Sequence, residues 1–239
     1  MKLGIDFDNT IVCYDYLFYR EALSLGLIPR ALVPNKNLIR EYVRENEGEN
    51  EWVLLQSIVY GHKIHDATPY PGVVEFFSHA KNHLDIYIIS HKTNSNALDK
   101  KADLNGAAKS WLHVNQISQM LPDHAIYFEN SRENKISRIK KTNCDIFIDD
   151  LIEIFLHPDF PINTKKILFD PHNHHKRLDK ISTFKDWKEI KQIPRGRDQH
   201  KDFLQLPNSF DEIHNGDGSL LRDLNYIYFF YFLPKTKIF

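Results

Sequence analysis

The residues most able to do chemistry come near the start of the chain. Asp6 and Asp8 close a short apolar run, with Phe7 between them. Alternation along a strand places the two carboxylates on one side and Phe7 on the other. Neighbouring carboxylates repel each other, and this raises the pKa of one of them unless a cation lies between them. The pattern indicates a metal or catalytic site at a strand end, with a polar surface turn as the alternative.

Similar polar groups follow other apolar runs. Ser90 follows the second run, and Asp149 and Asp150 follow a later one. Lys135 lies in the first turns of a helix for which Ser131 is the expected N-cap. Because the carboxyl ends of parallel strands meet at one edge of a sheet, these groups are expected to converge with Asp6 and Asp8 in one crevice.

Strand and helix patterns alternate over most of the chain. The first strand leads to Asp6, and the nearly continuous apolar run at 84–89 is typical of a strand buried on both faces. The alternation favours a parallel sheet with right-handed crossovers. Further strands are predicted at 125–128, 144–148 and 166–169, and helices at 73–81, 105–114 and 131–141.

Three helical patterns follow the first strand with no strand between them. They cover 16–25, 37–44 and 51–60, with a polar break at 45–51 and Gly61 as the expected end of the third. We therefore interpret residues 15–68 as a small helical insert. The predicted core comprises residues 1–14 and 69–192.

The last part of the chain, residues 193–239, is interpreted as an extension of uncertain structure. It contains a dense aromatic run at 226–233. A strand that packs on the rest of the protein is the favoured interpretation, and a contact that forms a homo-oligomer is the alternative.

Composition excludes several function classes. The net charge is −1, so nucleic-acid binding is not predicted. Two cysteines, Cys13 and Cys144, form no disulfide framework and indicate a reducing, cytoplasmic environment. We find no signal peptide and no apolar stretch near the roughly 18 residues of a spanning helix, so no membrane association is expected.

These motifs resemble one known superfamily. The segments DFDNTIV, PYPGV, IYIISHK and IFIDDL, with the helix-opening lysine, resemble the haloacid dehalogenase-like phosphatase superfamily over about residues 1–190. Their order is specific for the superfamily but not for a substrate. The resemblance implies an α/β fold with a Rossmann-like parallel sheet flanked by helices. It also implies that residues 15–68 form a small helical cap inserted after the first strand.

The resemblance also implies catalytic roles. Asp6 would be the nucleophile that forms an aspartyl phosphate. Asp8 would protonate the leaving oxygen and then activate water. Ser90 would donate a hydrogen bond to a phosphoryl oxygen, and Lys135 would offset charge on the nucleophile and the phosphate.

A metal site is implied as well. Asp6, the backbone carbonyl of Asp8 and Asp149 would hold Mg²⁺, with Asp150 as a ligand or in support. Four carboxylates at one point would be difficult to keep ionised without such an ion.

Residues beside these motifs are candidates for substrate binding. They are Asn9, Thr10, His91 and Lys92, although the Thr10 hydroxyl is better explained as a turn-bonding group. Other histidines in predicted loops are expected to be solvated, namely His62, His65, His172, His174 and His175.

The sequence thus predicts a Mg²⁺-dependent phosphomonoester hydrolase for a small phosphorylated metabolite. A phosphotransferase or phosphomutase would keep the same residues. A non-catalytic interaction protein on this fold stays open. Asp8 argues against a dehalogenase, because a halide leaves without a proton. A signalling receiver domain is disfavoured, because in receivers the acidic pair comes on the first strand and the phosphoacceptor later, whereas here the pair Asp149 and Asp150 comes last. A receiver would also leave the insert at 15–68 unexplained.

Overall fold

The computed structural model describes residues 1–95, 98–176 and 178–189. The predicted extension at 193–239, with its aromatic run, lies outside the described residues. Among the described helices, none is long and apolar enough to cross a membrane.

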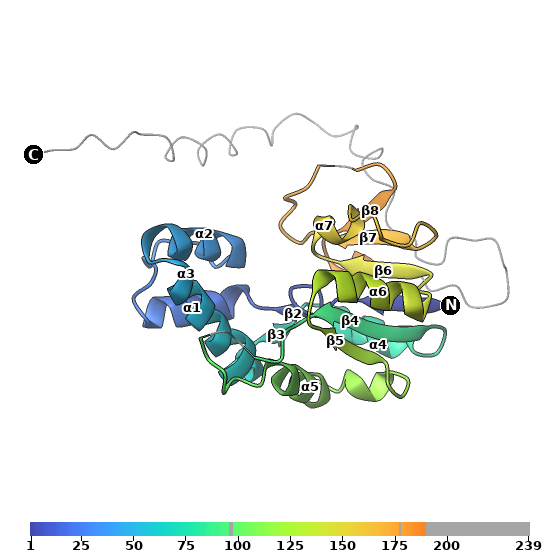
Figure 1. Ribbon diagram of the computed structural model, residues 1–239, viewed down its shortest axis with the longest axis horizontal. Coiled ribbons are helices and arrows are strands. Elements are labelled where there is room, and N and C mark those ends of the chain that lie inside the picture. The colour runs from blue at the N-terminus through green and yellow to red at the C-terminus, as the bar shows by residue number, and fades with distance from the viewer. Residues whose placement is uncertain (96–97, 177, 190–239) are drawn as a thin grey trace, which may run out of the picture. The chain divides into compact units, whose positions relative to one another are not determined.

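The core is a six-stranded parallel sheet (Figure 1), which confirms the predicted fold class. Its strand order is β5-β4-β1-β6-β7-β8. The strands are β1 (Lys2–Ile5), β4 (Asp85–His91), β5 (Ile126–Glu129), β6 (Ile146–Asp149), β7 (Lys165–Phe169) and β8 (Ile181–Phe184). The first strand lies at the centre, where Ile5 is paired with Ile88 of β4 and Ile148 of β6.

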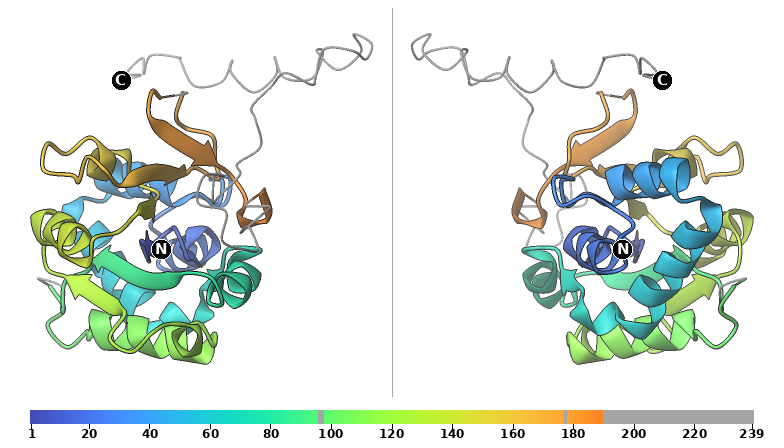
Figure 2. Two further views of the ribbon diagram at one scale, coloured as in Figure 1. Left: turned by 90° about the vertical axis from the view of Figure 1, so that its right-hand side faces the viewer. Right: turned by 90° about the vertical axis from the view of Figure 1, so that its left-hand side faces the viewer.

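Helices cover both faces of the sheet. In Figure 2, α4 (Val73–Ala80) and α6 (Arg132–Thr142) lie on opposite sides of the strands. Successive strand residues enter two different cores: Ile88 packs in the cluster that includes α4 and α5 (Leu104–Val114), whereas Ile89 packs with residues of α6 and α7 (Ile152–Phe155). Burial on both faces explains the continuous apolar run of β4.

Gly4 in β1 allows the sheet to pack closely. A Cβ atom at this position would lie 2.4 Å from the ring of Phe147, which is fully buried. A glycine in a central strand costs conformational entropy, but here it leaves room for an aromatic ring against the strand that carries Asp6.

The helices predicted between the first strand and residue 68 are present. They are α1 (Asp15–Ser24), α2 (Lys36–Asn46) and α3 (Glu49–Ser57), followed by a π-helix (Ile58–His62) and a 3₁₀ turn (Ile64–Asp66). In Figure 1, α1–α3 group together beside the end of the sheet toward which β1 runs from the N-terminus. Two short antiparallel strands, β2 (Val12–Cys13) and β3 (Thr68–Pro69), close the base of this segment.

Two expectations about these helices were wrong. The polar break is only Glu47 and Gly48, because α2 continues to Asn46 and α3 begins at Glu49. Gly61 lies inside the π-helix instead of ending α3. A Cβ atom at Gly61 would come within 3.1 Å of Leu104, so this glycine permits close packing against α5. The sequence reading also missed the short elements β2, β3, α7 and β8.

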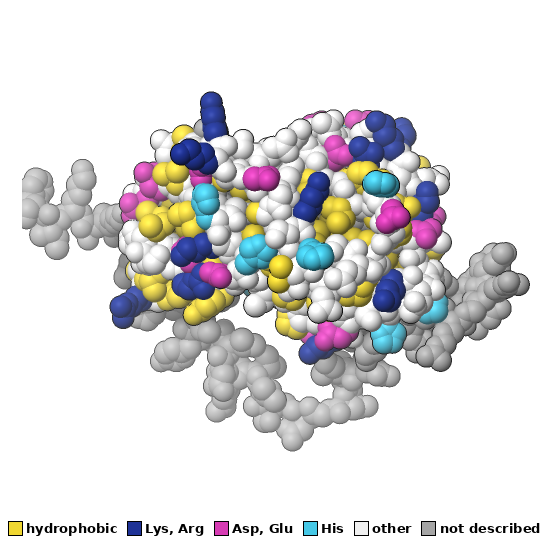
Figure 3. All heavy atoms as spheres, turned by 90° about the horizontal axis from the view of Figure 1, so that it is seen from below, with side chains coloured by type: hydrophobic (Ala, Val, Ile, Leu, Met, Phe, Trp, Pro, Cys, Tyr) yellow, Lys and Arg dark blue, Asp and Glu magenta, His cyan; other side chains and the backbone are white. Residues whose placement is uncertain are grey.

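On the face drawn in Figure 3, Lys and Arg side chains are interspersed with Asp and Glu. This mixed surface agrees with the net charge of −1.

Candidate active site

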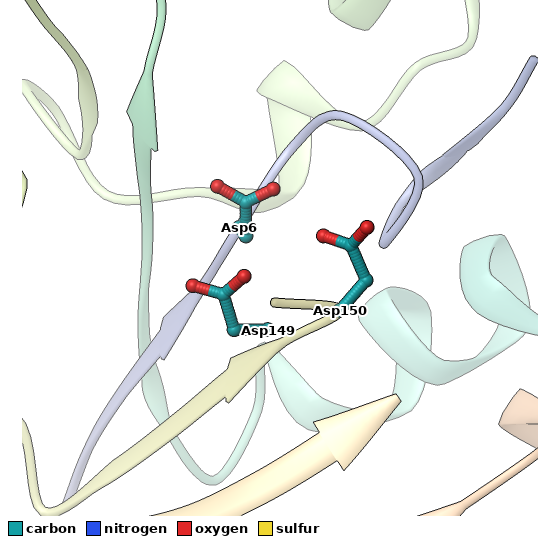
Figure 4. Close-up of side chains that lie close together, drawn as sticks. All are labelled: Asp6, Asp149 and Asp150. Atoms are coloured by element: carbon teal, nitrogen blue, oxygen red, sulfur yellow. The ribbon is translucent and has the colours of Figure 1, made fainter. Parts of the chain in front are cut away.

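Three carboxylates from two adjacent strands form the centre of the site. Asp6 follows β1, Asp149 ends β6, and Asp150 is the next residue. One oxygen of each lies within 4.8 Å of one oxygen of the others, and Figure 4 shows their carboxyl groups gathered at the strand ends. The backbone holds the two strands in register, since the amide of Asp6 donates to the carbonyl of Ile148 at 2.9 Å.

Lys135 joins this carboxylate cluster from α6. Its Nζ lies 2.5 Å from Asp6 Oδ1 and 2.7 Å from Asp149 Oδ2, and the side chain is buried. Ser131 caps the helix as expected, because its hydroxyl accepts a hydrogen bond from the amide of Asn134. Burial opposes the charge of the Lys135 ammonium, but Asp149 and Asp6 raise its pKa above the usual value.

The combined negative charge of the three carboxylates is larger than the single positive charge of Lys135 can offset. Burial, strengthened by the charge of Asp6, raises the pKa of Asp149 to about 7. Burial and the two neighbouring carboxylates raise the pKa of Asp150 well above its usual range. A divalent cation among these oxygens would stabilise their ionised forms, and an all-oxygen donor set fits a hard ion such as Mg²⁺.

The turn after Asp6 is fixed by its own hydrogen bonds. Asn9 has a φ of +57°, in the left-handed region that Asn tolerates, and the amides of Ile11 and Val12 both donate to the carbonyl of Phe7. Thr10 is fully buried. Its hydroxyl donates to Asp150 Oδ1 at 3.4 Å, while its carbonyl accepts from Trp187 Nε1 at 3.0 Å. Thr10 therefore supports the turn and Asp150.

Asp8 is held separately from the three-carboxylate cluster. Lys92 Nζ lies 2.9 Å from each of its carboxylate oxygens, and the Tyr14 hydroxyl donates to Oδ1 at 2.7 Å. Burial and the charge of Asp8 raise the pKa of Tyr14 well above its usual value, so the phenol stays protonated. Sequence reasoning selected Lys92 as a substrate ligand and missed Tyr14, which no motif marks.

Ser90 and His91 lie at the end of β4, next to the strand that carries Asp6. Ser90 is buried and His91 is exposed. Although the residue is exposed as a whole, partial desolvation of its ring and the nearby Lys135 lower the pKa of His91.

Four other histidines form contacts with residues outside the carboxylate cluster. His62 is within 2.8 Å of Asp99, and His172 is within 2.8 Å of Asp15. The remaining pairs join His65 to Ser110 and His175 to Asp170.

Two further residues approach the site from the helices that follow β2. Lys36, the first residue of α2, has its Nζ 5.6 Å from the ring centroid of Tyr60 in the π-helix. Although burial opposes it, Tyr60, Asp150 and Asp8 raise the pKa of Lys36 above its usual value. No sequence signal pointed to this pair, since the π-helix sets the direction of Tyr60.

No family model and no curated protein sequence matches this chain. Solved structures do match it. A HAD-superfamily hydrolase of subfamily IA, variant 1, from Geobacter sulfurreducens PCA has a TM-score of 0.50 and 12% identity, over 80% of this chain and 94% of that one. A haloacid dehalogenase-like family hydrolase from Streptococcus pneumoniae has a TM-score of 0.50 and 14% identity, over 71% of this chain and 84% of that one. At these identities the likeness establishes the fold.

Proposed function

We propose that this chain, which has the haloacid dehalogenase-like fold, is a Mg²⁺-dependent phosphomonoester hydrolase that works through an aspartyl phosphate. The observation that carries the proposal is the buried ion-pair arrangement in which Lys135 contacts both Asp6 and Asp149. Phosphoryl transfer needs chiefly positioned groups and neutralised charge, and this arrangement supplies both beside a candidate nucleophile.

The chemistry begins at Asp6. A carboxylate oxygen of Asp6 attacks phosphorus, and a new O–P bond forms while the bond from phosphorus to the ester oxygen breaks. Lys135 orients the Asp6 carboxylate through their ion pair and offsets negative charge beside it. Asp8 gives its proton to the leaving oxygen, which departs as an alcohol.

The second step returns the enzyme to its starting state. Asp8, now a carboxylate, takes a proton from a water molecule as that water attacks phosphorus, and the Asp6–phosphorus bond breaks. Inorganic phosphate leaves, Asp6 is again a carboxylate, and Asp8 is again protonated. Mg²⁺, held by Asp6 and Asp149 with Asp150 in support, would neutralise charge on the phosphoryl group when bound.

The substrate class follows from Asp8. A halide leaves without a proton, so a dehalogenase has no use for a second carboxylate beside the nucleophile. An alkoxide leaving group does need a proton, which favours a phosphate ester of a small metabolite.

The test is a panel of phosphorylated metabolites and aryl phosphates, with a haloacid as the competing substrate class. We expect release of inorganic phosphate with Mg²⁺, loss of that activity in EDTA, and recovery when Mg²⁺ is added back. The Asp6→Asn variant is the control for contaminating phosphatases. Equal turnover in EDTA, or halide release without phosphate release, would contradict the proposal.

A further inference from the structure

The carboxylate of Asp8 is held by side chains to which the proposed mechanism gives no role. Its carboxylate accepts from two donors on different parts of the chain: Lys92, just after β4, and Tyr14, just before α1. The Lys92 side chain is only 3% exposed, whereas that of Asp8 is 20% exposed. A buried donor therefore holds a carboxylate that still reaches solvent.

Lys92 is itself held in place. Its Nζ lies 4.7 Å from the ring centroid of Tyr60 and 5.4 Å from that of Phe7. Both contacts are within the range in which an aromatic ring attracts an ammonium group. The backbone amide of Lys92 also donates to the carbonyl of Glu129 at 2.8 Å, which fixes the chain where β4 ends.

Tyr14 is equally confined. It is fully buried, and its ring meets that of Tyr60 edge to face, with 4.9 Å between the centroids. Tyr60 thus contacts both donors of Asp8. The orientation of this carboxylate depends on one packed group made of Tyr14, Tyr60 and Lys92.

We infer that Lys92 and Tyr14 are positioning residues for Asp8, which set its carboxylate where it serves the leaving oxygen. The inference rests on the proposed function. A proton donor must lie within hydrogen-bonding reach of the atom that it protonates, and displacement by about 1 Å can cost about 10²-fold in rate. An Asp8 side chain with one donor removed would sample other orientations.

This assignment has a measurable signature in the leaving group. An alkoxide requires the proton from Asp8, whereas a nitrophenolate departs without one. Loss of positioning should therefore lower kcat/KM, which reports the first step, far more for alkyl phosphates than for aryl phosphates, while a general loss of folding would lower it equally for both.

The experiment compares variants over a series of phosphomonoesters from nitrophenyl phosphates to simple alkyl phosphates, with Mg²⁺. The variants are Lys92→Met, Lys92→Arg and Tyr14→Phe. Lys166→Met is a matched control, because Lys166 donates to the carbonyl of Phe155 and lies 5.0 Å from the ring centroid of Phe160. Tyr19→Phe is the second control, because the Tyr19 hydroxyl donates to the carbonyl of Arg30.

We expect Lys92→Met to lower kcat/KM for both kinds of substrate to different extents. The loss for an alkyl phosphate should be about tenfold or more greater than the loss for nitrophenyl phosphate. Tyr14→Phe should act in the same direction with a smaller effect, and Lys92→Arg should restore part of the loss. Adding Lys92→Met to Asp8→Asn should cost nothing further, because the group to be positioned is already gone.

Equal losses of kcat/KM along the whole series in both Lys92→Met and Tyr14→Phe would overturn the inference while leaving the proposed function intact. If Lys92→Met does not fold, Tyr14→Phe with its Tyr19→Phe control decides the question. If the wild-type protein hydrolyses no ester, the proposed function fails and the inference fails with it.

Discussion

At the scale of residues, two aspartates only two positions apart have different surroundings. Asp6 shares Lys135 with Asp149, whereas Asp8 is bound by Lys92 and Tyr14. Strand geometry brings both to one sheet edge, but different neighbouring side chains give them different environments. In the proposed mechanism, Asp6 is the nucleophile and has a fixed cation beside it, whereas Asp8 is the proton carrier and keeps access to solvent.

This division predicts opposite behaviour of two isosteric variants. Asp6→Asn should form no phosphoenzyme with any substrate, since the attacking oxygen is gone. Asp8→Asn should still react with an aryl phosphate and then accumulate an acid-stable, hydroxylamine-sensitive acyl phosphate, because removing the base slows its hydrolysis about 10²–10⁴-fold. Intact-mass measurement after an acid quench detects the added phosphoryl group. Accumulation in Asp6→Asn but not in Asp8→Asn would reverse the assignment.

The sequence was informative about residues that follow strands. Asp6, Asp149 and Asp150 could be brought together because parallel strands end at the same edge. The position of Lys135 could be predicted because Ser131, as an N-cap residue, marks the start of the helix that carries it. Tyr14 and Tyr60 could not be foreseen, since their directions depend on how the helices after β2 fold back over the sheet and on a π-helix that local periodicity does not reveal.

At the scale of elements, strands with apolar runs were easier to predict than short strands of mixed character. β4 has a continuous apolar run at 86–89 and β6 has the apolar run Ile-Phe-Ile before Asp149, whereas β8 is four residues of mixed character, Ile-Ser-Thr-Phe, at the sheet edge. β8 forms because it pairs with β7. Its own four residues do not indicate that partner, so the strand could not be predicted from the local sequence.

Gly4 offers a test of the packing around β1. Gly4→Ala should destabilise the fold by about 1–3 kcal/mol, because the added methyl group overlaps the ring of Phe147 in a filled core. Urea unfolding measures the loss. Gly26→Ala is a useful comparison, since nothing lies within 4 Å of that added methyl group and only its positive φ of +72° opposes the change. A Gly4→Ala protein as stable as wild type would show that β1 and the Phe147 ring can move apart at little cost in free energy.

The contact between His172 and Asp15 joins the loop after β7 to the start of α1, and it predicts a dependence on pH. The hydrogen bond to Asp15 raises the pKa of His172 above its ordinary value of 6.5. The pair therefore stabilises the fold fully below pH 6.5, and this contribution disappears as pH rises through the raised pKa.

Melting temperatures of wild type and His172→Gln should accordingly differ most in mildly acidic buffer and converge at alkaline pH. The difference should be small, because the His172 side chain is 36% exposed. His79→Gln, at an exposed position on α4, controls for the loss of a histidine. A gap that widens with rising pH would contradict this account.

At the scale of the whole molecule, every proposed catalytic group lies before residue 151. The last described element is a 3₁₀ turn (Trp187–Glu189), and Trp187 donates to the carbonyl of Thr10 in the turn that follows Asp6. The residues needed to hold the site therefore extend to this tryptophan.

A chain that ends at Ile193 should keep the kcat of the full-length protein on an aryl phosphate. Its solubility can fall if the aromatic run at 226–233 normally covers apolar surface. Circular dichroism and size exclusion show whether the shortened protein is folded and monodisperse. A folded, soluble and inactive product would show that the extension shapes the site.

The central position of β1 has a consequence for how the protein is made. The strand is synthesised before both of its partners, because Ile5 pairs with Ile88 and Ile148, which come much later in the chain. Pairings between such distant segments form slowly, because a long stretch of chain must be ordered before the contact is made. Asp6 meets Asp149 only when β6 has joined the sheet. The nascent chain therefore cannot assemble the carboxylate cluster until β6 has been synthesised and paired with β1.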